Sequence, residues 1–116
     1  MLWLICSFGK PKSEVGEVRK KFNEPHRAYL KSKDHMIFCA GPLQNDDGTE
    51  NNGSMWIIKA NSRAEAEAFS EAEPYTKASV FANVIISRLR EGHLHLHPEL
   101  AGSQCVEYLK KRNPIA

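Results

Sequence analysis

Two titratable side chains, each next to a proline, are the groups in this chain best suited to proton transfer. His26 follows Pro25, and Glu73 precedes Pro74. An imidazole and a carboxylate held on rigid backbone can together move a proton to and from a small molecule. Their distance along the chain does not show that they meet, so the chemistry depends on the elements that carry them.

The local sequence around His26 predicts a helix start. The segment 13–33 has the apolar spacing of a helix, with Val15, Val18 and Phe22 on one face. Because proline is tolerated in the first turn of a helix but not in its interior, we expect a break after Phe22 and a new helix capped by Asn23. His26 would then lie in a first turn, where the helix dipole favours a neutral imidazole. A His that only forms a hydrogen bond at a helix start is the simpler interpretation.

Glu73 lies near the end of a second predicted helix. Ser62 and Glu65 have the spacing of a capping box, which predicts that this helix starts there. Pro74 is expected to end or kink it. The expected apolar face of this helix carries Ala64, Ala68, Phe69 and Ala72, and its acidic residues are Glu65, Glu67, Glu71 and Glu73. Spacing alone does not distinguish Glu73 from the other three acidic residues, which are typical of a solvated helix surface.

Four apolar segments bounded by turn residues predict strands at residues 2–8, 36–40, 54–59 and 80–89, with a polar hairpin loop at 44–53. The order β-α-β-β-α-β is that of an α+β, ferredoxin-like fold with a four-stranded antiparallel sheet. Two helices cover only one face of such a sheet, yet both faces of these strands are apolar. We therefore expect a second copy of the chain to cover the other face, giving a homodimer.

The composition is that of an ordinary globular domain. The chain has 116 residues, 26% of them charged, and a net charge of +2. This charge is too small to predict binding to nucleic acid. The apolar start of the chain is too short for a membrane span, and it lacks the basic region and the small-residue cleavage site of a signal peptide. Three cysteines without a CxxC spacing favour reduced thiols and a cytoplasmic location.

Several segments together resemble the YciI-like (YCII-related) family. These are HRAYL at 26–30, AGPL at 40–43, GSMWII at 53–58 and AEAFSEAEPYTKA at 66–78. The resemblance covers about residues 1–90 and leaves 91–116 as a C-terminal extension. It implies a ferredoxin-like fold whose sheets pair into a dimeric α+β barrel. In fold the family is similar to muconolactone isomerase, and at least one relative removes chloride from a chlorinated hydroquinone.

The resemblance also implies a site. The family's proposed active site is a His–Asp pair, with the histidine at the position of His26 and the aspartate at that of Glu73. The chain keeps the carboxylate but adds a methylene group, and it has Ser79 where the family usually has glycine. Arg27 could bind an anionic group, and Tyr29 and Tyr75 could line a pocket, although an exposed arginine and packed aromatic rings are the commoner roles.

Three alternating histidines could bind a metal ion. His93, His95 and His97 alternate with leucines, and in an extended strand their imidazoles would point to one side. No fourth ligand is fixed nearby, so we expect no metal and interpret the three histidines as a polar face. A short helix is expected at 104–112.

These observations favour one function over two alternatives. The favoured hypothesis is an enzyme without a cofactor, in which His26 is the base and Glu73 orients it. It would isomerise, eliminate from or hydrolyse a small cyclic or aromatic organic acid. The alternatives are a non-catalytic dimer that binds a small molecule and a purely structural dimer. A His26–Glu73 contact would favour the enzyme, and a pocket without that contact would favour the binding protein.

Overall fold

A computed structural model describes residues 1–10 and 12–90 of the chain. Its elements follow the predicted order, with one additional short helix before the last strand. They are β1 (Leu2–Gly9), α1 (Lys12–Ser32), β2 (Ile37–Gln44), β3 (Asn51–Lys59), α2 (Arg63–Ala72), α3 (Pro74–Lys77) and β4 (Phe81–Leu89). The histidines at 93, 95 and 97 and the expected helix at 104–112 lie outside the described residues.

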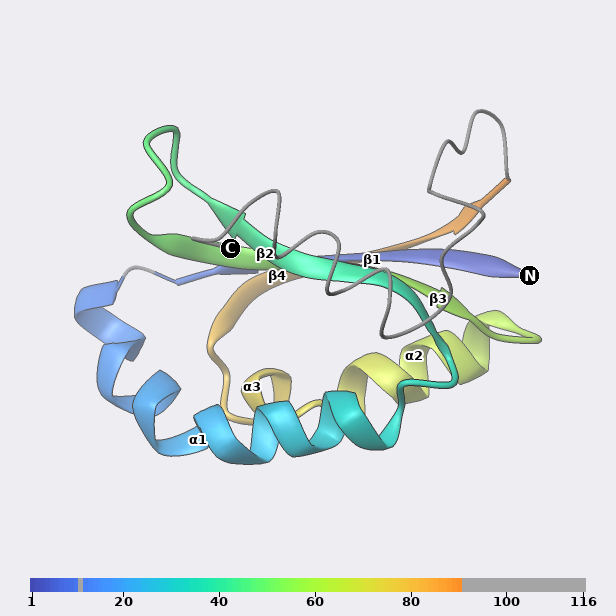
Figure 1. Ribbon diagram of the computed structural model, residues 1–116, viewed down its shortest axis with the longest axis horizontal. Helices are drawn as coiled ribbons and strands as arrows, with labels where there is room; N and C mark the ends of the chain where they lie inside the picture. Colours follow the sequence, from blue (N-terminus) through green and yellow to red (C-terminus); the bar gives the residue numbers. More distant parts are fainter. Residues whose placement is uncertain (11, 91–116) are drawn as a thin grey trace, which may run out of the picture.

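The four strands form one antiparallel sheet in the order β2-β3-β1-β4. All three helices lie on the same side of it (Figure 1). This arrangement confirms the ferredoxin-like α+β fold that the order of elements predicted. Hydrogen-bonded strands alternate their side chains between the two faces, so every second residue of β1 and β3 points toward the helices.

Two buried clusters fill the space between sheet and helices. The larger contains Trp3, Ile5, Trp56, Ile58, Ala60, Ala66 and Phe69, with Tyr29 and Leu30 of α1 packed against it. The smaller contains Val15, Tyr75, Val80 and Phe81, with Val18 and Phe22 of α1 packed against it. Helix α1 therefore covers both clusters, its first half over the smaller one and its second half over the larger.

The predicted break in this helix at Pro25 was wrong. Helix α1 continues from Lys12 to Ser32 with Pro25 inside it, and its direction changes along its length (Figure 1). A proline inside a helix costs about 3 kcal/mol and bends it, because it lacks an N–H and its ring contacts the carbonyl group four residues earlier. Each large apolar side chain buried by the two halves returns about 1.5–3 kcal/mol, so packing outweighs the cost of the bend. His26 consequently lies inside a helix, and the dipole argument for its charge state does not apply.

Helix α2 begins as predicted but buries a different face. Ser62 is its N-cap and accepts a hydrogen bond from the Glu65 amide at 3.2 Å, while the Glu65 carboxylate accepts one from the Asn61 amide at 2.8 Å. Of the four residues expected on its apolar face, Phe69 is buried and Ala72 is half-buried. The buried positions within the helix are Ala66, Phe69 and Ser70, and Ala64 and Ala68 are exposed. Glu73, the C-cap, continues the buried stripe.

The hairpin between β2 and β3 is shorter than predicted. Strand β2 extends to Gln44 and contains Gly41 and Pro42, which lie beyond the predicted end of this strand at residue 40. Because β2 is an edge strand, Pro42 can lie in it without removing a hydrogen bond from a central ladder.

The sheet face away from the helices carries a row of apolar residues. Cys6 is paired with Ile85 and with Met55, so these three side chains share that face. Ile85 is 54% exposed and Phe8, on the same face, is 42% exposed. Within residues 1–10 and 12–90, no helix is both long enough and apolar enough to cross a bilayer.

Candidate active site

His26 and Glu73 lie 47 residues apart in the sequence and are hydrogen bonded to each other through Nδ1 of the imidazole and Oε1 of the carboxylate. The Glu73 side chain is fully buried, whereas 15% of the His26 side chain is exposed. Among the described residues, His26 makes no other side-chain hydrogen bond. Its Nε2 therefore has no side-chain hydrogen-bond partner within residues 1–10 and 12–90.

The backbone around Glu73 explains why a carboxylate is buried there. Glu73 ends helix α2 and is also the N-cap of α3, with Pro74 in the first turn of α3. Its second carboxylate oxygen, Oε2, accepts a hydrogen bond from the Thr76 amide at 3.0 Å and lies 3.3 Å from the Thr76 hydroxyl. Oε2 is thus held by the cap of α3, and Oε1 contacts His26. These hydrogen bonds compensate the cost of burying the charged carboxylate.

Tyr75 fixes the plane of the imidazole. Its ring is stacked on that of His26, with centroids 4.1 Å apart and planes inclined by 16°. The Tyr75 hydroxyl lies 3.2 Å from both the Arg19 carbonyl and Oδ1 of Asn23, either of which can accept its proton. These contacts join α3 to α1, and the Tyr75 side chain is buried.

His26 also lies near the larger cluster. The Trp56 ring centroid lies 6.3 Å from that of His26, and Trp56 packs edge-on against Phe69. His26 is thus placed where the two buried clusters meet. A ring between packed aromatic residues has little freedom to rotate, so Nε2 keeps a fixed direction.

The buried surroundings affect both tyrosines. Burial raises the pKa of Tyr29, and the negative charge of Glu73 adds to this shift. Burial also raises the pKa of Tyr75, partly offset by the positive charge of Arg19. The Arg19 guanidinium lies over the Tyr75 ring at 5.6 Å, and its Nη2 atom is buried without a hydrogen-bond partner in the described part of the chain.

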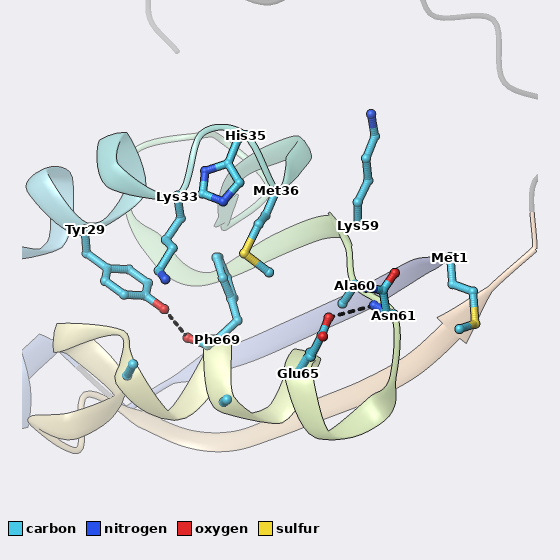
Figure 2. A pocket seen from close by; sticks show the side chains of 12 residues that line it. Met1, Tyr29, Lys33, His35, Met36, Lys59, Ala60, Asn61, Glu65 and Phe69 are labelled. Atoms are coloured by element: carbon cyan, nitrogen blue, oxygen red, sulfur yellow. Dashed lines mark hydrogen bonds between the residues drawn. The ribbon is translucent and has the colours of Figure 1, made fainter.

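The structure separates the remaining predicted site residues. Tyr29 donates a hydrogen bond to the Phe69 carbonyl at 2.7 Å, and its ring lines a pocket between α1, α2 and the end of β3 (Figure 2). Arg27, the residue after His26, is exposed. That pocket, of about 690 Å³, is not lined by His26 or Glu73, and neither is a second pocket of about 670 Å³.

Sequence reasoning missed three residues that support the pair: Thr76, Trp56 and Arg19. Thr76 could have been found, because Glu73-Pro74 has the pattern of an N-cap followed by proline, and the residue three places after the cap donates to it. Trp56 follows from strand alternation once the register with β1 is known. No signal in the sequence marks Arg19. Within residues 1–10 and 12–90, no group of three or more histidine, cysteine or acidic side chains could hold a metal ion.

Residues 1–90 match the family model of the YCII-related domain. This chain belongs to the YCII-related family. No curated protein sequence matches the chain closely enough to count as a relative.

One solved structure is similar over most of the domain. It is the 5-chloro-2-hydroxyhydroquinone dehydrochlorinase from Burkholderia phenoliruptrix AC1100, in a complex with 2,5-dihydroxybenzoquinone. The two sequences are 33% identical, the TM-score is 0.70, and the match covers 79% of this chain and 96% of the dehydrochlorinase. The dehydrochlorinase in that structure holds a small cyclic molecule, 2,5-dihydroxybenzoquinone.

A more distant structure is Rv0793 from Mycobacterium tuberculosis. It is 14% identical with a TM-score of 0.46, and the match covers 79% of this chain and 98% of Rv0793. This likeness is too weak to support an inference about the YCII-related chain described here.

Proposed function

We propose that this protein is a small-molecule enzyme in which His26 transfers protons and Glu73 orients it. The observation that carries the proposal is the hydrogen bond between Nδ1 of His26 and the fully buried carboxylate of Glu73. A buried carboxylate that accepts from one imidazole nitrogen holds the proton there, so the other nitrogen can act as the base. It also stabilises the imidazolium that forms when Nε2 takes a proton.

Elimination is the reaction that the similarity to the dehydrochlorinase favours. In loss of HCl from a chlorinated hydroquinone, a hydroxyl proton is moved to the ring carbon that bears chlorine. Chloride then departs with the electron pair of the C–Cl bond, and a second hydroxyl proton is released, so that a quinone forms. The first proton step needs a group that accepts a proton and then donates it, and the second needs one that accepts a proton. The Nε2 atom of His26 can do both. No cofactor is required by this sequence of steps.

The role of Glu73 in this proposal is indirect. Its Oε2 is occupied by the cap of α3, so only Oε1 is available to the imidazole. The extra methylene group of glutamate, compared with the aspartate expected from the family, reaches His26 from this capping position. Glu73 therefore positions the ring and balances its charge, and the substrate contacts His26.

The test is release of chloride from 5-chloro-2-hydroxyhydroquinone, followed by ion chromatography under anaerobic conditions, with a protein-free reaction as the blank. The wild-type protein should release chloride faster than the blank, and His26→Ala should lower that rate by about 10²–10⁴-fold. Glu73→Gln should also lower it, whereas the matched change Glu71→Gln, at an exposed position two residues away, should not. Absence of protein-dependent chloride release would contradict the elimination, and an unchanged rate in His26→Ala would contradict the role of the pair.

A further inference from the structure

The pocket between the end of α1, the start of α2 and the end of β3 is separate from the His26–Glu73 pair. Its floor is apolar, with Phe69 at its centre and Met36 beside it (Figure 2). The Phe69 side chain is 3% exposed and belongs to the larger buried cluster, so this floor is rigid. Tyr29 forms the wall nearest the pair, and its hydroxyl is occupied by the Phe69 carbonyl.

Two lysines and one glutamate line this pocket. Lys33 reaches over it from the end of α1, and its Nζ lies 5.9 Å from the centroid of the Tyr29 ring (Figure 2). Among the described residues, Lys33 has no ion-pair partner. Lys59 lies at the rim, and its side chain points away from the floor (Figure 2). The acidic residue of the pocket, Glu65, lies on the opposite side.

The carboxylate of Glu65 is already engaged. It accepts the Asn61 amide at 2.8 Å, and the Glu65 amide donates to Ser62, so this side chain belongs to the N-terminal cap of α2. The ammonium group of Lys33 lies near the Tyr29 ring but has no carboxylate partner among the described residues. An ammonium group beside an apolar floor attracts an anion, and the floor itself favours a flat apolar ring.

We propose that this pocket binds a small aromatic carboxylate, with its ring on Phe69 and Met36 and its carboxylate at Lys33. The site does not include His26 or Glu73, since neither residue lines this pocket. It goes beyond the proposed reaction, because occupancy of this pocket requires neither proton transfer nor the pair.

Binding of benzoate, measured by isothermal titration calorimetry at low salt, tests this site. Benzamide is the matched neutral ligand of the same shape. Benzoate should bind roughly tenfold tighter than benzamide, because a charge-assisted hydrogen bond to Lys33 exceeds a neutral one by about that factor. Lys33→Gln should remove this preference. Lys31→Gln, which changes the same charge on the last turn of α1 outside the pocket lining, should leave it intact.

Four results would overturn the proposal. The first is no detectable binding of benzoate, and the second is equal binding of benzoate and benzamide to the wild-type protein. The third is an equal loss of benzoate binding in Lys31→Gln and Lys33→Gln, which would indicate attraction by net charge alone. Benzoate binding should persist in His26→Ala, and its loss there would place the ligand at the pair instead of the pocket. The chloride assay is unaffected by any of these outcomes, so the two proposals can fail separately.

Discussion

The Tyr75 ring lies on the His26 imidazole at a centroid separation of 4.1 Å, and Tyr75 is only two residues after the carboxylate that His26 contacts. One short segment, 73–76, thus supplies the hydrogen-bond partner of His26, the ring stacked on it and the donor that fixes the carboxylate. The turn at Glu73-Pro74 therefore determines the direction, plane and partner of the imidazole.

The contact between His26 and Glu73 should appear as coupling in stability. His26→Ala leaves a buried carboxylate without one of its partners, so we expect a loss of about 1–3 kcal/mol in the free energy of unfolding. The double variant with Glu73→Gln should differ from the sum of the single variants by at least about 0.5 kcal/mol. Urea denaturation of the four proteins measures this. Additive effects would show that the two side chains do not interact in solution.

Stability should fall at alkaline pH because of two tyrosines. Burial raises the pKa of Tyr29 and Tyr75 above their value in the unfolded chain, which is about 10. A raised pKa in the folded state contributes stability that is complete below the unfolded pKa and is lost as the pH rises through the folded pKa. The free energy of unfolding should therefore decrease above about pH 10. Replacing both tyrosines by phenylalanine should flatten this decrease, and an equally steep decrease in that variant would contradict the assignment.

Ser79 should be a site of local strain. It has a φ of 59°, in the left-handed region, and it follows α3 where the backbone turns toward β4. A residue with a Cβ atom costs roughly 1 kcal/mol there compared with glycine. Ser79→Gly should therefore raise the melting temperature. The neighbouring change Ala78→Gly is the control, since Ala78 has a φ of −82° and should lose stability with glycine. A lower melting temperature in Ser79→Gly would contradict the strain.

The exposed sheet face should pair with a second copy of the chain. Ile85 lies on this face and is 54% exposed, whereas Val84, the residue before it on β4, points to the helix side and is 38% exposed. Light scattering should give a dimer for the wild-type protein and for Val84→Lys. Ile85→Lys should give a monomer, because the charge would be buried in the interface. A monomeric wild-type protein, or a stable Ile85→Lys dimer, would exclude this face as the interface.

The sequence was sufficient for the order of elements. Strands with alternating apolar residues and a clear N-cap at Ser62 gave the ferredoxin-like fold, since these local signals agree with the packing that follows. The candidate site was harder to predict from the sequence. His26 and Glu73 could be named together only through the resemblance to the family, because nothing in the spacing distinguishes Glu73 from the other acidic residues of its helix.

The wrong predictions for α1 and α2 have their cause in tertiary packing. Local propensity predicts a helix break at Pro25, but both halves of α1 bury apolar side chains in different clusters, and their joint burial keeps the helix continuous. The buried face of α2 was misassigned because two of its positions, Ser70 and Glu73, are polar. A search for apolar residues cannot identify a buried helix face that includes a serine and the Glu73 carboxylate, which caps α3.

The most direct test of the central claim is the position of the imidazole proton in His26. Nitrogen-15 NMR of the neutral side chain distinguishes a proton on Nδ1 from one on Nε2. We predict Nδ1–H in the wild-type protein, held by the Glu73 carboxylate, with Nε2 free to accept a proton. In Glu73→Gln the side-chain amide can donate to Nδ1, so the proton should move to Nε2, while the exposed His35 is unchanged in both proteins. A proton on Nε2 in the wild-type protein, or the same tautomer in both proteins, would contradict the claim.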